Sequence, residues 1–113
     1  MRAARLRRSG DIKTLRAEGR SLHRASFSAR LRRTDLSATR LAVIAPGNVG
    51  RAVARNRARR RVREAFRIAL QGRSPNVGNV GLDILVTARP EALHTEFIAL
   101  RDDAASVLSE KTS

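Results

Sequence analysis

The chain has 113 residues, contains no cysteine, tryptophan or tyrosine, and carries a formal net charge of +14. This length suits one domain with a modest core, and the missing thiols exclude a disulfide framework and cysteine-based metal sites. No apolar stretch approaches the roughly 20 residues of a membrane-spanning helix, and the basic N-terminus lacks the apolar region of a signal peptide, so we expect a cytoplasmic protein.

The positive charge is concentrated in the first two thirds of the chain. Residues 1–73 hold 21 of the 24 Lys and Arg but only 4 of the 10 Asp and Glu, whereas residues 74–113 are net acidic. A small fold with such a field repels itself, and a polyanion that releases its counterions is the usual partner. We therefore expect a nucleic acid, with an anionic membrane as the alternative.

The N-terminal segment divides into an arm and the start of a domain. Residues 1–9 are basic and aperiodic, which predicts a flexible basic arm ahead of a single RNA-binding domain over residues 10–110. Residues 11–19 have the pattern of a short helix, which a glycine ends.

Strand patterns follow this first helix. Residues 20–33 alternate in part with a break near 23–26, which predicts two short strands or one bulged strand. A polar hairpin turn is expected at 34–39, before an apolar strand over 39–47 that should lie centrally in a sheet. The expected inward residues of the first strand segment are Leu22, Phe27, Ala29 and Leu31.

The second half of the chain alternates between helix and strand. Residues 50–72 form the longest helical pattern, and residues 74–81 read as a loop. An apolar strand at 82–90 and a final helix at 91–110 follow. The order predicts an α+β protein, a small α-β(β)β-α-β-α sandwich with its helices packed on a central sheet.

The central helix has one apolar face. Successive helical residues are about 100° apart, so apolar residues at matching steps form a stripe that can pack on a sheet. The stripe consists of Val62, Ala58, Ala65, Phe66, Ala69 and Leu70.

A second face of this helix is basic. Asn56, Arg60, Arg63 and Arg67 form a ridge at steps of four and three, flanked by other arginines and by one acid, Glu64. Glu64 can pair with Arg60 or Arg61, but one acid cannot neutralise the ridge. A merely solvated face would interleave more acids, so the ridge predicts an RNA-binding surface.

In the first turns of the helix, arginines lie on the same side of the helix as the apolar stripe. Burying them unpaired would be costly, so Arg51, Arg55 and Arg59 are expected to stand clear of the core and meet a ligand. Amides at a helix start also suit phosphate. The candidate RNA-binding residues are Arg51, Arg55, Asn56, Arg57, Arg59, Arg60, Arg63 and Arg67.

The segment from Gly50 to Phe66 resembles a motif of the protein subunit of bacterial ribonuclease P, with Gly-x-Ala-Val-x-Arg-Asn-Arg at its start. The short first helix, the strand with Phe27 and the later apolar strand closed by proline match that family in order and spacing. The resemblance covers roughly residues 5–108.

This resemblance implies a fold, partners and a division of labour. The fold has a left-handed β-α-β crossover around the basic helix, against the usual right-handed rule. The implied partners are a catalytic RNA subunit, which cleaves the 5′ leader from precursor tRNA, and the precursor itself. No catalytic protein residue, protein-bound cofactor or metal, membrane or small-molecule substrate is implied, but Mg²⁺ is expected in the RNA–protein holoenzyme.

The resemblance also implies a cleft for the leader between a helix and the sheet. Family members line it with aromatics from the first helix and the second strand. The corresponding candidates here are Ile12, Arg16, Phe27 and Arg30, of which only Phe27 is aromatic. Stacking a base on an aromatic side chain is worth about 1–3 kcal/mol, so we expect leader binding to depend more on arginine–phosphate contacts and on salt.

Other functions have weaker support in the sequence. The two histidines, His23 and His94, have no neighbouring catalytic or metal-ligand pattern, which disfavours a stand-alone nuclease. Residues 47–50 resemble the GxxG loop of a KH domain but follow a strand instead of a helix. The alternative left open is a ribosomal-type or general nucleic-acid-binding protein with no part in tRNA processing.

Overall fold

The computed structural model describes residues 4–5, 9–34, 39–72 and 81–109, and the expected loop at 74–81 lies almost wholly outside them. The strands are β1 (Ala4–Arg5), β2 (Arg20–His23), β3 (Phe27–Thr34), β4 (Arg40–Ile44) and β5 (Gly81–Ala88). The helices are α1 (Ser9–Glu18), α2 (Ala52–Gln71) and α3 (Phe97–Ser109), with 3-10 turns η1 (Gly47–Val49) and η2 (Pro90–Leu93). This confirms the predicted α+β order.

The five strands of the described residues form one sheet, in the order β1-β4-β5-β3-β2. β5 lies in the middle, parallel to β4 and antiparallel to β3. Because parallel neighbours need a long connection, the chain crosses from β4 to β5 through α2. The basic helix thus lies in the chain between two strands that are neighbours in the sheet.

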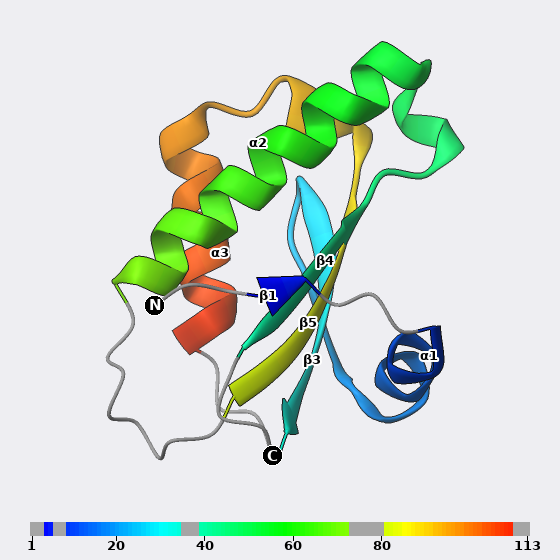
Figure 1. Cartoon of the computed structure of the whole chain (residues 1–113). Helices are drawn as coiled ribbons and strands as arrows, with labels where there is room; N and C mark the ends of the chain where they lie inside the picture. The colour runs from blue at the N-terminus through cyan, green and yellow to red at the C-terminus, as the bar shows by residue number, and fades with distance from the viewer. Residues whose placement is uncertain (1–3, 6–8, 35–38, 73–80, 110–113) are drawn as a thin grey trace.

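Helices cover both faces of the sheet. α2 and α3 lie side by side on one face, and α1 lies on the other (Figure 1). β5 is buried on both faces because Ile84 and Val86 join the larger core while Leu85 packs against Leu15 of α1. A strand covered on both sides is largely apolar, as this one is apart from Asp83 and Thr87.

The predicted hairpin at residues 34–39 is wrong. β3 and β4 are not partners, because β5 lies between them and pairs with both. Turn-forming residues signal a change of direction, but the sequence between two strands does not say whether a third will insert. The break near 23–26 is real and separates two antiparallel strands, β2 and β3.

The N-terminal segment contains a strand that its sequence does not indicate. Ala4 and Arg5, within the predicted arm, pair in parallel with Arg40 and Leu41 of β4. Backbone hydrogen bonding needs no side-chain pattern, so a two-residue edge strand leaves no periodic signal. The rest of the predicted arm, apart from Ser9 in α1, lies outside the described residues.

An ion pair lies inside the sheet between β4 and β5. Arg40 donates two hydrogen bonds to Asp83, from Nε to Oδ1 at 2.8 Å and from Nη2 to Oδ2 at 2.7 Å. The Asp83 side chain is only 2% exposed. Since a buried carboxylate is costly without a partner, this pair helps to hold the parallel strands in register.

Candidate nucleic-acid interface

The central helix is anchored through the apolar stripe predicted from its sequence. Ala58, Val62, Ala65, Phe66 and Leu70 are all buried, and Ala69 is half-buried. The ring of Phe66 meets that of Phe27 edge-on, with centroids 5.2 Å apart. These contacts turn the opposite face of α2, which carries the arginines, away from the core.

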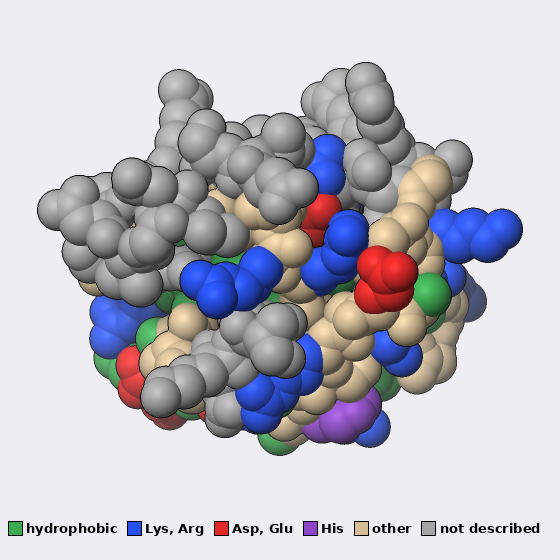
Figure 2. Space-filling view, turned by 90° about the horizontal axis from the view of Figure 1, so that it is seen from below, with side chains coloured by type: hydrophobic (Ala, Val, Ile, Leu, Met, Phe, Trp, Pro, Cys, Tyr) green, Lys and Arg blue, Asp and Glu red, His purple; other side chains and the backbone are tan. Residues whose placement is uncertain are grey.

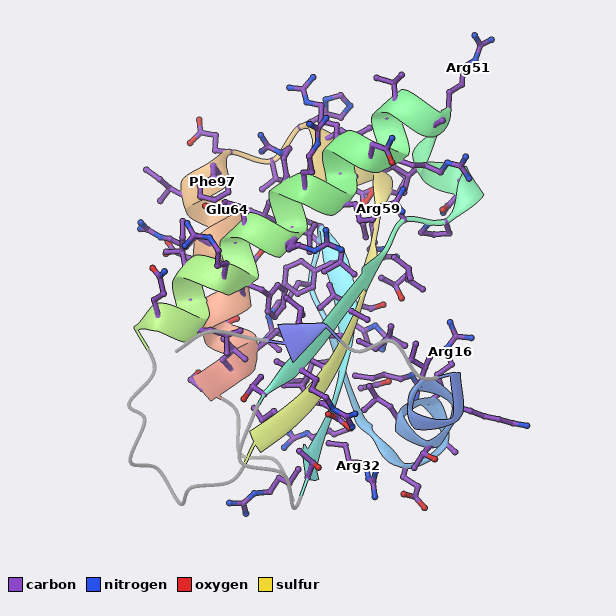
Figure 3. The ribbon with its side chains drawn as sticks, viewed as in Figure 1. Arg16, Arg32, Arg51, Arg59, Glu64 and Phe97 are labelled. Carbon is purple, nitrogen blue, oxygen red and sulfur yellow. The ribbon has the colours of Figure 1, made fainter. Side chains whose placement is uncertain are left out.

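The first turns of α2 stand partly clear of this core. Arg51, at the N-cap position, is exposed and points away from the molecule, and Val53 is 80% exposed (Figure 3). Arg55 is half-buried, and its Nε has no hydrogen-bond partner among the described residues. The expectation of arginines clear of the core therefore fits Arg51 fully and Arg55 only in part.

Gly50 sets the direction in which α2 leaves the η1 turn. Its φ of +142° is a conformation that side chains rarely allow, and an added Cβ would lie 3.0 Å from the Cβ of Ala54. Glycine is the residue that adopts such a backbone without strain. The positive φ of Gly50 thus explains why the motif begins with a glycine.

Three arginines and one amide enclose a hollow along the exposed face of α2. It has a volume of about 490 Å³ and is lined by Asn56, Arg59, Arg60 and Arg63. Nη2 of Arg59 donates to Oδ1 of Asn56 at 2.7 Å, which holds this guanidinium over the helix. Guanidinium groups bind phosphate oxygens in a planar, bidentate way, so the hollow suits a nucleic-acid backbone.

Arg67 continues the ridge but has an acidic partner. Its Nε donates to Oε2 of Glu64 at 2.8 Å, and a second nitrogen donates to Oε1. The hydrogen bond from Arg67 lowers the pKa of Glu64 and raises that of Arg67. The spacing allowed Glu64 to pair with Arg60 or Arg61, and the structure pairs it with Arg67.

Arg61 differs from the other arginines of this run because it turns toward the protein. Its Nε donates to the carbonyl of Ala92 at 2.9 Å, and Nη2 donates to the carbonyl of Thr95. Sequence reasoning put Arg61 beside the ridge and did not make it a candidate RNA contact. Its carbonyl partners lie about 30 residues away in sequence, so no local pattern could reveal them.

A second basic recess lies on the opposite face of the sheet, beside α1. It has a volume of about 250 Å³ and is lined by Arg16, Ser21, His23, Ser28, Ala29, Arg30, Leu85 and Thr87. Nη1 of Arg30 donates to the carbonyl of Arg16 at 2.7 Å, linking β3 to the end of α1. Two of the four candidate leader-cleft residues, Arg16 and Arg30, therefore line one recess.

The other two leader-cleft candidates lie elsewhere. Ile12 packs against the small apolar cluster under α1 and is not among the lining residues. Phe27 is fully buried against Phe66 on the other face of the sheet, so its prediction as a leader contact is corrected. Side chains along a strand point alternately to the two faces of the sheet. The inward position predicted for Phe27 therefore already implied that Phe27 and Arg30 point to opposite faces.

Sequence reasoning missed the hydroxyl and imidazole groups of the recess. Ser21 and His23 of β2 lie opposite Arg30 and Ser28 of β3 in the antiparallel register. Only the strand pairing brings these four side chains to one face, although the alternation along β3 gave part of the signal.

Seen from below, Lys and Arg side chains are spread among fewer acidic ones (Figure 2).

Within the residues that the structure describes, no three His, Cys, Asp or Glu side chains gather as a metal site would require. No helix in the same part of the chain is long and apolar enough to cross a membrane.

Comparison with known proteins decides the family. The sequence model described as Ribonuclease P matches residues 1–112. The chain belongs to the ribonuclease P protein family. The ribonuclease P protein component of Chloroflexus aurantiacus is 36% identical over 110 residues, covering 96% of this chain and 78% of the relative. That of Thermotoga maritima is 35% identical over 96 residues, covering 85% and 77%.

Solved structures of this family share the fold. The ribonuclease P protein of Thermotoga maritima superposes with a TM-score of 0.76 at 29% identity, over 92% of this chain and 94% of that one. The Staphylococcus aureus protein gives a TM-score of 0.75 at 23% identity, over 95% and 94%. Family membership favours tRNA processing over the ribosomal-type alternative that charge and size left open.

Proposed function

We propose that this chain is the RNA-binding protein subunit of a ribonuclease P holoenzyme and assists the 5′ maturation of tRNA. The observation that carries the proposal is the arginine-lined hollow on α2, in a chain of this family. In this proposal the hollow and the exposed arginines of the same helix bind the catalytic RNA subunit. We infer a location in the bacterial cytoplasm, because tRNA is transcribed and processed there.

The recess beside α1 is the proposed contact for the 5′ leader of precursor tRNA. Arg16 and Arg30 supply positive charge, and Ser21, Ser28 and Thr87 supply hydroxyls that can bind phosphate oxygens. The recess and the hollow lie on opposite faces of the sheet, so one protein can contact two RNA segments at once. Charge-assisted hydrogen bonds of this kind are the stronger ones in proteins.

We assign the chemistry to the RNA subunit. Among the described residues no three His, Cys, Asp or Glu side chains gather, and the sequence shows no Ser-His-Asp or paired-carboxylate motif. Mg²⁺ would supply charge stabilisation to the cleavage step, held by RNA phosphates. The side chains of this protein would bind and orient the RNA.

Reconstitution tests this assignment. The protein alone should leave precursor tRNA intact, while protein plus ribonuclease P RNA should cleave it at a lower Mg²⁺ concentration than the RNA alone needs. Cleavage is read from end-labelled precursor on a gel. Processing by protein that is free of RNA would refute the division of labour, and an unchanged Mg²⁺ requirement would refute the assisting role.

A further inference from the structure

Arg61 lies among the RNA-facing arginines of α2 but makes its contacts within the protein. Its guanidinium spans two main-chain carbonyls, those of Ala92 in η2 and Thr95 just after it. The neighbouring side chains Arg60 and Arg63 line the hollow on the exposed face. Arg61 therefore connects the helix that carries one proposed RNA surface to the segment before α3.

The connection continues from Thr95 toward the second RNA surface. Oγ1 of Thr95 lies 2.6 Å from Oγ of Ser26, which is fully buried. The carbonyl of Ser26 accepts a hydrogen bond of 2.9 Å from the amide of Arg89 at the end of β5. Ser26 directly precedes β3, whose Ser28 and Arg30 line the recess. The hydrogen bonds of Thr95 with Arg61 and with Ser26, continued by the chain from Ser26 into β3, thus connect α2 to the strand beneath the recess.

Apolar packing alone would leave the helix less well oriented than these contacts do. The hydrophobic effect has no direction, and the buried stripe of α2 begins only at Ala58. Hydrogen bonds prefer near-linear geometry, so a guanidinium held at two carbonyls restricts rotation of the helix about its own axis. That rotation decides where Arg60 and Arg63 point relative to the recess.

We propose that Arg61 is a positioning residue that fixes the α2 hollow relative to the recess beside α1, so that one protein grips the RNA subunit and the leader together. This inference rests on the proposed function. Two contacts on one rigid body strengthen each other only when both can be made simultaneously. Loss of the Arg61 contacts should therefore reduce the gain in precursor affinity that the leader provides, although the side chains of both RNA surfaces are unchanged.

The charge-preserving variant Arg61→Lys tests the proposal in the reconstituted holoenzyme. Lysine keeps the net charge but has no planar fork for two carbonyls. The readout is the ratio of affinities for precursor tRNA with its leader and for mature tRNA without it. We expect this ratio to fall about tenfold, within the usual range of coupling between two sites, while affinity for the isolated RNA subunit is retained.

Two further variants keep the test interpretable. Thr95→Val removes the hydroxyl that meets Ser26 without altering either RNA surface, and we expect the same direction of change. Arg101→Lys makes the same exchange at an exposed position of α3, away from these hydrogen bonds, and should change the ratio by less than about twofold. Urea unfolding of each variant verifies that the protein is folded at the assay temperature.

The outcomes separate the inference from the proposed function. If folded Arg61→Lys and Thr95→Val keep the wild-type ratio, Arg61 only stabilises the fold and the inference fails. A loss of affinity for the isolated RNA subunit in Arg61→Lys would make Arg61 a direct RNA contact, which also overturns the inference. If the wild-type holoenzyme shows no preference for the leader-bearing precursor, the proposed leader contact itself fails.

Discussion

At the residue scale, the arginines of α2 differ in what their guanidinium groups contact. Arg59 is held over the helix by Asn56, Arg61 is bound to main-chain carbonyls, and Arg67 is paired with Glu64. Arg60 is exposed and lines the hollow. Substitutions that remove one arginine charge should therefore change RNA affinity by different amounts, depending on what that arginine contacts.

The first prediction concerns Arg60. Arg60→Ala should weaken binding of the ribonuclease P RNA and flatten the plot of log affinity against log salt by about one unit, as expected for one lost phosphate contact. Filter binding at several salt concentrations measures both quantities. Arg101→Ala removes an exposed charge from α3 and should leave the slope nearly unchanged, and an equal loss in both variants would place the RNA surface elsewhere.

The second prediction concerns Glu64, which competes with RNA for Arg67. Glu64→Gln should tighten RNA binding about twofold, as expected for release of an exposed ion pair, and steepen the salt dependence. Because Arg67 lowers the pKa of Glu64, the ion pair is intact above the ordinary glutamate pKa. It is lost as pH falls through the lowered pKa, where variant and wild type should converge. A constant difference at every pH would contradict this account.

At the scale of elements, two ion pairs that involve the sheet differ in how deeply they are buried. The Arg40–Asp83 pair is largely buried, whereas the Arg32–Glu18 pair between β3 and α1 joins side chains that are 40% and 61% exposed. Exposed pairs contribute little because water and salt screen them. A buried carboxylate that loses its partner is far more costly.

The third prediction follows from this contrast. Arg40→Met should lower the free energy of unfolding by about 3 kcal/mol, because Asp83 would remain buried without its partner. Arg32→Met, on β3, should cost less than about 1 kcal/mol. Urea denaturation followed by circular dichroism compares the two, and similar losses for both variants would show that burial of Asp83 contributes little to stability.

At the scale of the whole molecule, the protein offers RNA many cations and hardly any aromatic surface. The chain has three phenylalanines and neither tyrosine nor tryptophan. Phe27 and Phe66 are fully buried, and Phe97 packs against the same core while half-buried. RNA recognition must therefore rest on arginines and hydrogen bonds, which read the phosphate backbone more than the bases.

The fourth prediction tests this mode of recognition. Replacing the leader nucleotides of precursor tRNA with abasic ones keeps the phosphates, so holoenzyme affinity should change by less than about threefold. One lost base stack would cost about 1–3 kcal/mol, or roughly fivefold and more. Competition binding with intact and abasic leaders measures the difference, and a tenfold loss would show that bases are stacked in the complex.

Much of the fold and part of the site could be predicted because the relevant signals are periodic. The buried stripe of α2 follows from helical spacing, and the inward Phe27, Ala29 and Leu31 follow from alternation along a strand. The hairpin between β3 and β4 and the leader role of Phe27 were wrong. The first depended on where β5 inserts, and the second on which face of the sheet α1 covers.

The sequence by itself determined the class of fold, the basic helix and its two faces, because hydrophobic periodicity and charge are local properties. It also carried the motif that identifies the family. Only the tertiary structure decided which arginines face RNA and which bind the protein, since the carbonyls that hold Arg61 come from a distant segment. It likewise assembled the recess, because β2, β3 and β5 become neighbours only through long-range strand pairing.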